Sequence, residues 1–499
     1  MSARSKHTLS HYRLLTGDMG RLYPVGLVEV LPKDTFQHST SLFLRFSPMA
    51  APVMHPVTVR LHHFFVPHRL VWPESEGGGW EQFITSGPDG TDAQEVPTIP
   101  TTSTAADLFD YYGLPQISGL NVNAMPIRGL NLIFNEWFRD QDLVTARLEG
   151  DTSVPLVSWQ KDYLTTARPW PQKGPAITLP IGARAPVHGI GYADGGDFDT
   201  TGTGINQAGG LTSDFASDAQ SGGSGAKTLH IEEDPDNTGF PNIWADLSSS
   251  EAVPINEFRK AFALQRYAEA RARYGSRYTE YLKYLGCNPR DSRLQRPEYL
   301  AGGKTQVAMS EVLQTADDTG GPGDRFGIGD MYGHGVAHMR SNAYRRTFDE
   351  HGYVHTCISV RPKAIYTHGA ERHWLRRFRD DYWQRELQHI GQQEVWDGEV
   401  FVDATPSDEE TYSTFGYADR YREYREQQSR IAGEFRNVLD YWHLAREFAS
   451  PPVLNPSFIE CDPSKRIFNV QDQDTLWMAA QHRLVARRLV SRNAAGRIL

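Results

Sequence analysis

A stretch of alternating residues from Val57 to Trp72 constrains the fold of this chain more than any other feature. Successive side chains of a β-strand point to opposite faces. One face of this stretch carries Val57, Val59, Leu61, His63 and Phe65. That face is mostly apolar and suited to a core, whereas the other changes from polar near its start to apolar near its end. Pro67 ends the strand because proline has no N–H to donate. The stretch therefore predicts a central strand of a β-protein, with one end covered on both sides.

The composition favours a loop-rich, all-β protein. The 499 residues include 22 Tyr, 23 Phe and 11 Trp, together with 30 Pro and 44 Gly. Further strands are expected at 22–31, 41–46, 351–361 and 467–470. The apolar spacing of residues 475–490 fits a helix about as well as a strand. Because strands lie toward both ends of the chain, we expect the two ends to pair with each other.

Helical spacing is confined to a few segments between the strands. Residues 130–139 have it, and so do residues 255–285, where Gly275 is expected to break the helix and Gly286 to stop it. Residues 182–225 hold 12 of the 44 glycines and almost no large apolar side chains. Such a segment cannot bury enough surface to offset the entropy of ordering it. We expect a long surface insertion within one domain.

Charge is distributed unevenly along the chain. The formal net charge is −10, which argues against nucleic-acid binding through the overall field of the protein. Both ends are basic, however, and basic ends are suited to contacting phosphate. The candidate nucleic-acid-binding residues are Arg4, Lys6, Arg13, Arg483, Arg487, Arg488 and Arg492. Solvated, frayed ends are the alternative that the composition leaves open.

Motifs for catalysis, cofactors and metals are incomplete. Gly302-Gly303-Lys304-Thr305 resembles part of a phosphate loop, but Glu298 stands where that loop requires glycine. His334 and His338 lack the neighbouring glutamate of a metalloprotease helix. No Gly-x-Ser-x-Gly sequence is present, and the three cysteines are far apart. The sequence therefore predicts a protein that is not an enzyme and that uses no cofactor or metal.

Six blocks, taken in order, give the chain a family resemblance. They resemble the major capsid proteins of the Microviridae, small icosahedral phages with circular single-stranded DNA, and two of them match the gokushovirus-like branch. The blocks are 59–72 with 80–84, 169–174 (Pro-Trp-Pro-Gln-Lys-Gly), 293–303 (Arg-Leu-Gln-Arg-Pro-Glu-Tyr-Leu-Ala-Gly-Gly), 351–361, 415–424 and 439–444. Residues 287–291 and 475–499 match less clearly, and an arginine-rich ending replaces the proline-rich ending of the family.

The resemblance implies a mainly β protein in which residues 1–499 form a single eight-stranded antiparallel viral jelly roll with long helix-containing loop insertions. It implies pentamers and an icosahedral shell of sixty copies around a circular single-stranded DNA genome. It also implies three viral partners: a small basic DNA-binding protein, a DNA pilot protein and a scaffolding protein. Residues 182–240 would form a variable protrusion at the threefold axes that meets a host-surface receptor. The chain would reside in the virion, and in the host cytoplasm during assembly.

Within this setting, aromatic residues in the inserted segments are candidates for inter-subunit contacts: Trp170, Tyr274, Tyr278, Tyr421 and Tyr424. The resemblance favours a strand at 475–490, within a basic C-terminal segment at 475–499. An interior site should stack bases on aromatic rings and neutralise phosphates with arginine. Two alternatives remain: an all-β carbohydrate-binding or glycan-hydrolysing protein, and an interaction module such as a tail or spike adhesin.

Overall fold

The computed structural model describes residues 4–86, 94–104, 106–177, 255–275, 277–313, 331–403 and 405–491, together with five short strands between 187 and 245. The chain divides into two compact units, Met1–Lys173 with Glu269–Leu499, and Gly174–Ala268. The short strands belong to the second unit: β8 Val187–His188, β9 Ile190–Tyr192, β10 Ala216–Ala219, β11 Thr228–Ile231 and β12 Trp244–Ala245. Most of the predicted insertion at 182–240 lies outside the described residues.

The four-stranded sheet of the first unit is built around the strand predicted from alternation. Its order is β13 (Glu298–Gln306), β5 (Val57–Pro67), β17 (Gly352–Pro362) and β3 (Leu22–Val30), and every pairing is antiparallel. All residues at the predicted core positions of β5 are buried, and its other face is half-buried at first and buried at Phe64 and Val66. The prediction for this strand is therefore confirmed, including its end at Pro67.

The seven-stranded sheet brings the two ends of the chain together. Its main order is β1 (Ser5–Thr8), β20 (Leu476–Arg488), β4 (Thr35–Phe46), β15 (Met331–Arg340) and β14 (Ala308–Leu313). In addition, β2 (His11–Gly17) pairs with β20, and β16 (Tyr344–Thr347) pairs with β4. This confirms the expected pairing of the ends and shows that residues 475–490 form a strand. The strand expected at 467–470 is wrong, because Phe468 makes only an isolated bridge to Met49.

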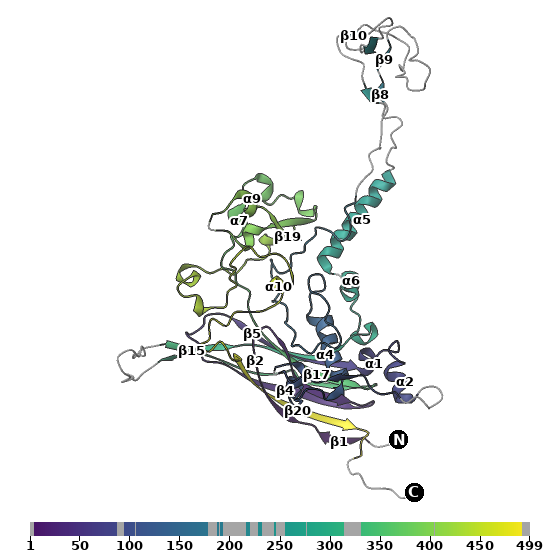
Figure 1. The fold of residues 1–499 in the computed structure, drawn as a ribbon, viewed down its shortest axis with the longest axis vertical. Coiled ribbons are helices and arrows are strands. Elements are labelled where there is room, and N and C mark those ends of the chain that lie inside the picture. Colours follow the sequence, from purple (N-terminus) through teal and green to yellow (C-terminus); the bar gives the residue numbers. More distant parts are fainter. Residues whose placement is uncertain are drawn as a thin grey trace. The chain divides into compact units, whose positions relative to one another are not determined.

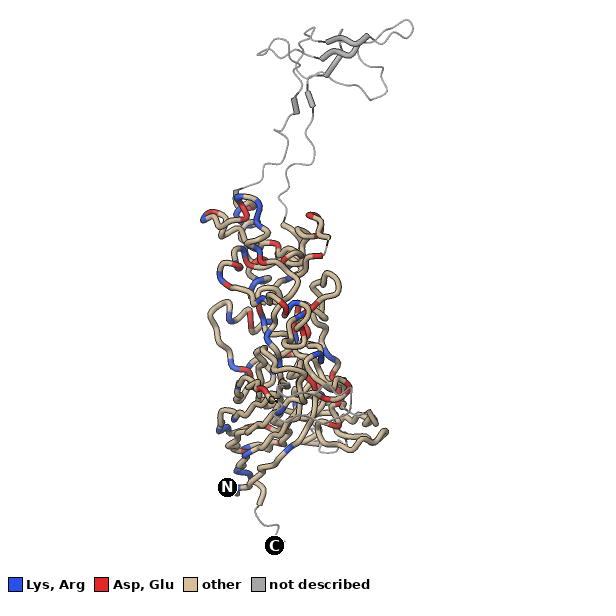
Figure 2. Tube along the Cα trace, turned by 90° about the vertical axis from the view of Figure 1, so that its left-hand side faces the viewer, with Lys and Arg blue, Asp and Glu red and all other residues tan. Residues whose placement is uncertain are grey.

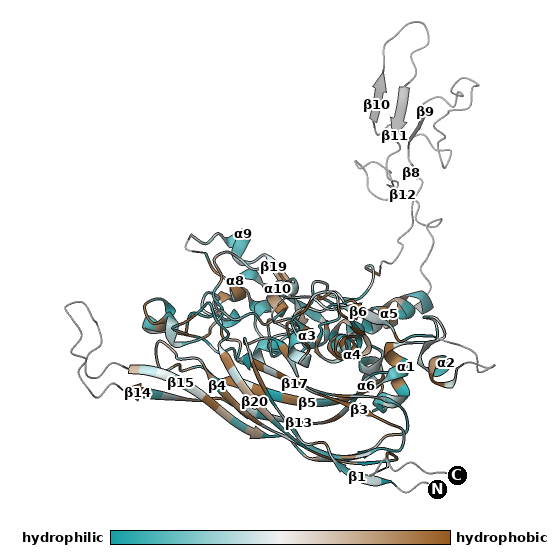
Figure 3. Cartoon of the chain, turned by 60° about the horizontal axis from the view of Figure 1, so that its bottom comes forward, coloured by the Kyte–Doolittle hydropathy of each residue, from teal (hydrophilic) through white to brown (hydrophobic). Residues whose placement is uncertain are grey.

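The two sheets enclose the main hydrophobic core. Residues from β4, β5 and β17, among them Leu42, Leu44, Leu61 and Ile358, belong to one buried cluster. Apolar residues recur along the strands of both sheets, which lie against each other (Figures 1 and 3). Burial of this surface provides the main driving force for closing the two layers. The other face of β5 is partly covered as well, because Phe64 and Val66 belong to a separate buried cluster with Met125 and Ile133, the first and last residues of helix α4.

Helices and short strands occupy the connections. They are α1 (His68–Val71), α2 (Gly79–Thr85), β6 (Thr98–Pro100), α3 (Leu108–Tyr112), β7 (Asn121–Asn123), α4 (Met125–Ile133), α5 (Ile255–Tyr274), α6 (Tyr278–Tyr284), α7 (Arg372–Leu375), β18 (Gln392–Trp396), α8 (Asp397–Val400), α9 (Asp408–Thr411), β19 (Thr414–Asp419) and α10 (Pro456–Ile459). The helical predictions at 130–139 and 255–285 are confirmed, and Gly275 and Gly286 have φ of 100° and 83° at the predicted break and stop. Within the described ranges, no helix has both the length and the apolar character needed to cross a membrane.

Candidate nucleic-acid interface

The side of the seven-stranded sheet that faces away from the core is named here the basic sheet face. Burial alternates strictly along β20, from buried Leu476 through exposed Trp477 to buried Met478. The registers of the neighbouring strands carry this alternation across the sheet. The basic sheet face consists of the outward side chains of β1, β2, β20, β4, β16 and β15.

The strands of this face carry positive charge and no negative charge at their outward positions. The outward positions of these six strands, all of them described, include no Asp or Glu. They include six basic residues: Lys6, Arg45, Arg340, Arg345, Arg483 and Arg487. In the described part of the chain, Arg45, Arg483 and Arg487 form no ion pair. Elsewhere acidic and basic residues interleave along the first unit (Figure 2). A face of this kind is complementary to an anionic partner even though the chain is acidic overall.

Exposed aromatic rings lie on the same face. Trp477 of β20 is 42% exposed and Phe43 of β4 is 46% exposed. The register places Ala479 directly between Phe43 on β4 and Leu14 on β2, with Trp477 two residues away along β20. A small side chain surrounded by large ones leaves a depression, which is named here the aromatic hollow. It forms part of a groove of about 990 Å³ that also includes Tyr12 and Arg45.

The structure separates the predicted nucleic-acid-binding residues into two groups. Lys6, Arg483 and Arg487 point outward on the basic sheet face, and Lys6 pairs in register with Arg487. Arg4 donates to the carbonyl oxygen of Lys33 at 2.9 Å and lies at the edge of the sheet. Arg492 lies outside the described residues. Nucleic-acid binding by Lys6, Arg483 and Arg487 thus remains a prediction, and their outward position on a positively charged face favours it.

Arg13 and Arg488 are used inside the fold, so the prediction that they contact nucleic acid is not supported by their placement. Arg13 donates to the backbone carbonyls of Tyr111 and Tyr112, at 2.9 and 3.1 Å, at the end of α3. Arg488 Nε lies 2.9 Å from Oδ2 of Asp34, which is fully buried. Burial raises the pKa of Asp34, and the positive charge of Arg488 opposes that rise. Both arginines thus have acceptors within the fold.

Sequence analysis missed the basic and aromatic residues of β4 and β15 and the ring of Trp477. Arg45, Arg340 and Phe43 lie far from the two basic ends of the chain, from which the candidate residues were selected. The usable signal was strand parity, since residues 35–45 alternate and place Phe43 and Arg45 on one side. Reading residues 475–490 as a strand would have placed Trp477, Arg483 and Arg487 together.

A histidine cluster lies between the two sheets. It is formed by buried His38 and His482 and half-buried His11 of the seven-stranded sheet, and by buried His63 of β5. Nε2 of His482 lies 2.9 Å from the carbonyl oxygen of Val25, which can only accept, so Nε2 carries the proton. Nδ1 of His482 then accepts from Nε2 of His38 at 3.2 Å. Nδ1 of His38 in turn accepts from the hydroxyl of Tyr344 at 3.1 Å. A single set of neutral tautomers therefore satisfies this chain of hydrogen bonds.

Burial lowers the pKa of the three buried histidines of this cluster. Desolvation lowers the pKa of His38 to about 3 and that of His482 to about 4, and neighbouring histidines lower both further. Desolvation also holds the pKa of His63 well below its usual range, while its ring nitrogens contact the hydroxyls of Thr356 and Ser341. His63 thus packs inside the fold with both ring nitrogens next to hydroxyl partners.

The predicted inter-subunit contact residues also divide by exposure. Tyr274, Tyr278 and Tyr424 are exposed, while Trp170 is half-buried with Lys173 Nζ 5.3 Å from its ring centroid. Tyr421 is only 6% exposed, and its hydroxyl donates to the carbonyl oxygen of Tyr382 at 3.2 Å. The ring of Tyr421 is thus packed within its own chain, which leaves little of it for the predicted inter-subunit contact.

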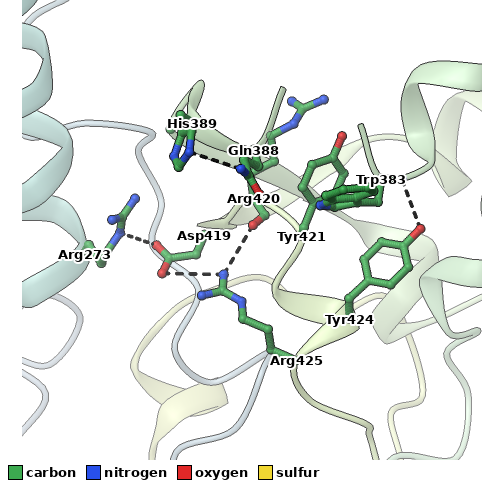
Figure 4. A pocket seen from close by; sticks show the side chains of 10 residues that line it. Arg273, Trp383, Gln388, His389, Asp419, Arg420, Tyr421, Tyr424 and Arg425 are labelled. Atoms are coloured by element: carbon green, nitrogen blue, oxygen red, sulfur yellow. Dashed lines mark hydrogen bonds and ion pairs between the residues drawn. The ribbon is translucent and has the colours of Figure 1, made fainter. Parts of the chain in front are cut away.

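A polar pocket of about 370 Å³ surrounds the end of β19. Asp419 accepts from Arg273 Nε at 2.7 Å and lies 3.9 Å from Arg425, and the Tyr424 hydroxyl accepts from the backbone N–H of Trp383 (Figure 4). These ion pairs join the end of α5 to the β18–β19 pair. The charged groups of this pocket are thus used to hold connections together.

The described side chains offer little to metal or nucleophilic chemistry. Within the described ranges, no three His, Cys, Asp or Glu side chains are grouped as metal ligands. Cys357 and Cys461 are free and buried, and burial raises the pKa of both thiols, that of Cys461 to about 12. Gly302-Gly303-Lys304-Thr305 lies within strand β13 and does not precede a helix as a phosphate loop does.

Comparison with known proteins gives one consistent result. The pattern of the phage capsid protein (F protein) family matches residues 1–493. The chain is 35% identical to capsid protein VP1 of Bdellovibrio phage phiMH2K, over 92% of this chain and 88% of that protein. It is 30% identical to capsid protein VP1 of Chlamydia phage 1, over 94% and 91%, and 27% identical to that of Spiroplasma virus 4, over 92% and 88%. The chain therefore belongs to the phage capsid protein (F protein) family of the Microviridae.

Proposed function

We propose that the chain is the structural unit of a closed icosahedral shell of sixty copies around a circular single-stranded DNA genome. Membership of the capsid family supports a structural, non-enzymatic role in the virion and self-assembly into a shell. Pentamers are the proposed assembly intermediate. Tyr274, Tyr278 and Tyr424 are the proposed contact residues, because their rings are exposed on inserted segments.

The fold proposed for this unit is an eight-stranded viral jelly roll. Two four-strand orders support it, β2-β20-β4-β15 and β3-β17-β5-β13. Each order interleaves early and late strands, as two Greek keys do when they close a double sheet. Strands β1, β14 and β16 are additions to this set. A jelly roll limits exposed sheet edges, and its loops supply the heterologous contacts that fivefold and threefold axes require.

The genome is proposed to lie against the basic sheet face. The observation that carries this proposal is the absence of outward Asp and Glu from six paired strands of an acidic chain. Neutralising phosphates with Lys and Arg releases counterions, which supplies affinity without sequence preference. A small basic DNA-binding protein, a DNA pilot protein and a scaffolding protein are proposed as further partners. Residues 182–240 are proposed to form the threefold protrusion that meets a host-surface receptor.

Cryo-electron microscopy of purified particles tests this function. The expected result is a shell with one copy of the chain per icosahedral asymmetric unit and nucleic-acid density over β20 and β4. A shell with the basic sheet face on its exterior would overturn the genome contact while leaving the structural role intact. A monomer that binds or cleaves glycans, with no tendency to form pentamers or shells, would overturn the structural role and favour the carbohydrate alternative.

A further inference from the structure

We infer that the aromatic hollow is a stacking subsite for a base of single-stranded nucleic acid. This inference rests on the proposed function, because it requires the basic sheet face to meet the genome. It goes further by naming the part of the ligand that is bound there. Phosphate contacts alone need only positive charge, whereas a base needs an exposed ring face with space beside it.

The register supplies that space. Directly opposed residues of neighbouring strands have Cβ atoms about 4.5–5.5 Å apart, and diagonal neighbours about 7–8 Å apart. Ala479 therefore forms the floor, Phe43 and Leu14 flank it directly, and Trp477 lies next along β20. Leu14 is 74% exposed, so the rim is open to solvent. A planar group can enter over the alanine and lie against the aromatic rings.

The charged residues around the aromatic hollow match a strand of nucleic acid. Arg45 pairs in register with Trp477, and Arg340 pairs with Ser41, which is itself opposite Gln481. Arg483 lies six residues beyond Trp477, about 20 Å along β20 at the rise of an extended strand. A nucleic acid that follows β20 would thus meet a guanidinium group on each side of the hollow.

The groove also includes two acidic residues, and both lie outside its strands. Asp474 precedes β20, and its carboxylate accepts from the hydroxyl of Thr16. The carboxylate of Asp110, in α3, accepts from the backbone N–H of Ala106 at 3.2 Å. Both carboxylates have donors within the fold, and neither belongs to an outward position of the strands.

An aromatic peptide from another protein is the competing occupant, since its side chains would also fill the hollow. The surrounding residues favour the nucleic acid, because an apolar peptide would leave Arg45, Arg483 and Arg487 without anionic partners. A nucleic acid satisfies both parts of the face at once, with bases on the rings and phosphates on the arginines.

A binding comparison on the full-length chain tests the subsite. Fluorescence anisotropy would measure binding of labelled oligothymidylate and of an abasic deoxyribose-phosphate oligomer of equal length and charge. The variants are Trp477→Ala, Trp477→Phe and, as a matched control, Trp374→Ala, because Trp374 is exposed but lies outside the basic sheet face. The unmodified chain should prefer the oligothymidylate, since only that probe has bases to stack.

Trp477→Ala should weaken oligothymidylate binding roughly 5- to 150-fold, corresponding to about 1–3 kcal/mol for one stacked base. It should leave abasic binding and the salt dependence unchanged, because no charge is removed. Trp477→Phe should keep most of the affinity, and Trp374→Ala all of it.

Two results would overturn the subsite. One is equal binding of the two probes by the unmodified chain, and the other is an equal loss for both probes in Trp477→Ala. If either occurs while Arg483→Ala still reduces the salt dependence, the proposed genome contact survives without the subsite. If oligothymidylate does not bind at all and a phenylalanine-rich peptide occupies the hollow, both the subsite and the genome contact fail.

Discussion

The two sides of β20 differ in almost every property although they belong to the same thirteen residues. The inward side carries Leu484 and His482, which are both buried. The imidazole of His482 has a hydrogen-bond partner inside the sandwich, the carbonyl oxygen of Val25. The outward side carries Trp477, Arg483 and Arg487, which are exposed. The two arginines have no ion-pair partner among the described residues. A strand makes this possible because its side chains alternate between faces with a period of two.

The difference teaches that folding and binding can be assigned to opposite faces of one element. Inward substitutions should then change stability, whereas outward substitutions should change nucleic-acid binding. The four predictions below test this separation, beginning with the largest expected effect.

Leu484→Ala should produce the largest loss of stability. Leu484 is fully buried in a cluster with Phe36 and Val354, so its truncation leaves a cavity. The expected cost is about 2–5 kcal/mol in the free energy of unfolding, measured by urea denaturation of the full chain. Leu14→Ala, the outward control, should cost less than about 0.5 kcal/mol. Equal costs for the two leucines would show that the faces are not separated.

Arg488→Ala should come next, at about 1–3 kcal/mol, because it leaves the buried carboxylate of Asp34 without its arginine. Adding Asp34→Asn to Arg488→Ala should recover part of that lost stability, because the buried carboxylate is then replaced by an uncharged amide. The measurement is a double-mutant cycle by urea denaturation. If Arg488→Ala leaves the free energy of unfolding unchanged, Arg488 does not stabilise the fold and belongs with the outward arginines Arg483 and Arg487.

The histidine cluster predicts a pH dependence. Because the pKa of His38 is lowered to about 3 in the folded chain from an ordinary value near 6.5, the unfolded chain takes up the proton first. The stability is complete above about pH 6.5 and is lost as the pH falls toward 3. His38 alone should cost about 2 kcal/mol at pH 5 relative to pH 7. His38→Gln should flatten this dependence, whereas His338→Gln, on the exposed side, should leave it unchanged; the reverse pattern would refute the assignment.

Arg483→Ala with Arg487→Ala should have the smallest effect on stability, within about 0.5 kcal/mol. It should instead reduce the slope of log affinity against log salt for single-stranded DNA by about 0.7 for each phosphate contact that is lost. Arg379→Ala is a suitable control, because Arg379 is exposed outside the basic sheet face. An unchanged slope, or DNA content unchanged in purified particles, would exclude these arginines from genome contact.

Some of this arrangement could be predicted from the sequence, and the reasons are physical. The alternation in Val57–Pro67 predicted a central strand correctly, because one face of this strand is buried along its whole length. Residues 475–490 were ambiguous because Trp477, Ala480 and Leu484 suit a helical stripe as well as a strand. Only pairing with β4 and β2, which is a long-range contact, decides between them.

The candidate site was predicted less well than the fold. Net charge near the ends selected Arg483 and Arg487, which point outward, but it also selected Arg13 and Arg488, whose acceptors lie within the fold. Tyr421 has a positive φ of 61° just after β19, which turns its ring into the chain, and no local sequence signal indicates that burial. Local composition predicts charge and exposure on average, whereas the direction of a single side chain depends on register.

The position of β20 between β4 and β2 also has a consequence for biosynthesis. Every other strand of its sheet leaves the ribosome before residues 476–488 do. Until then one edge of β4 is open, and β1 and β2 lack β20, the strand with which both pair among the described residues. Open edges invite pairing with other chains, and contacts this distant in sequence form slowly. Nascent chains in a crowded polysome would therefore depend on fast insertion of this strand, or on a chaperone that covers the β4 edge until it arrives.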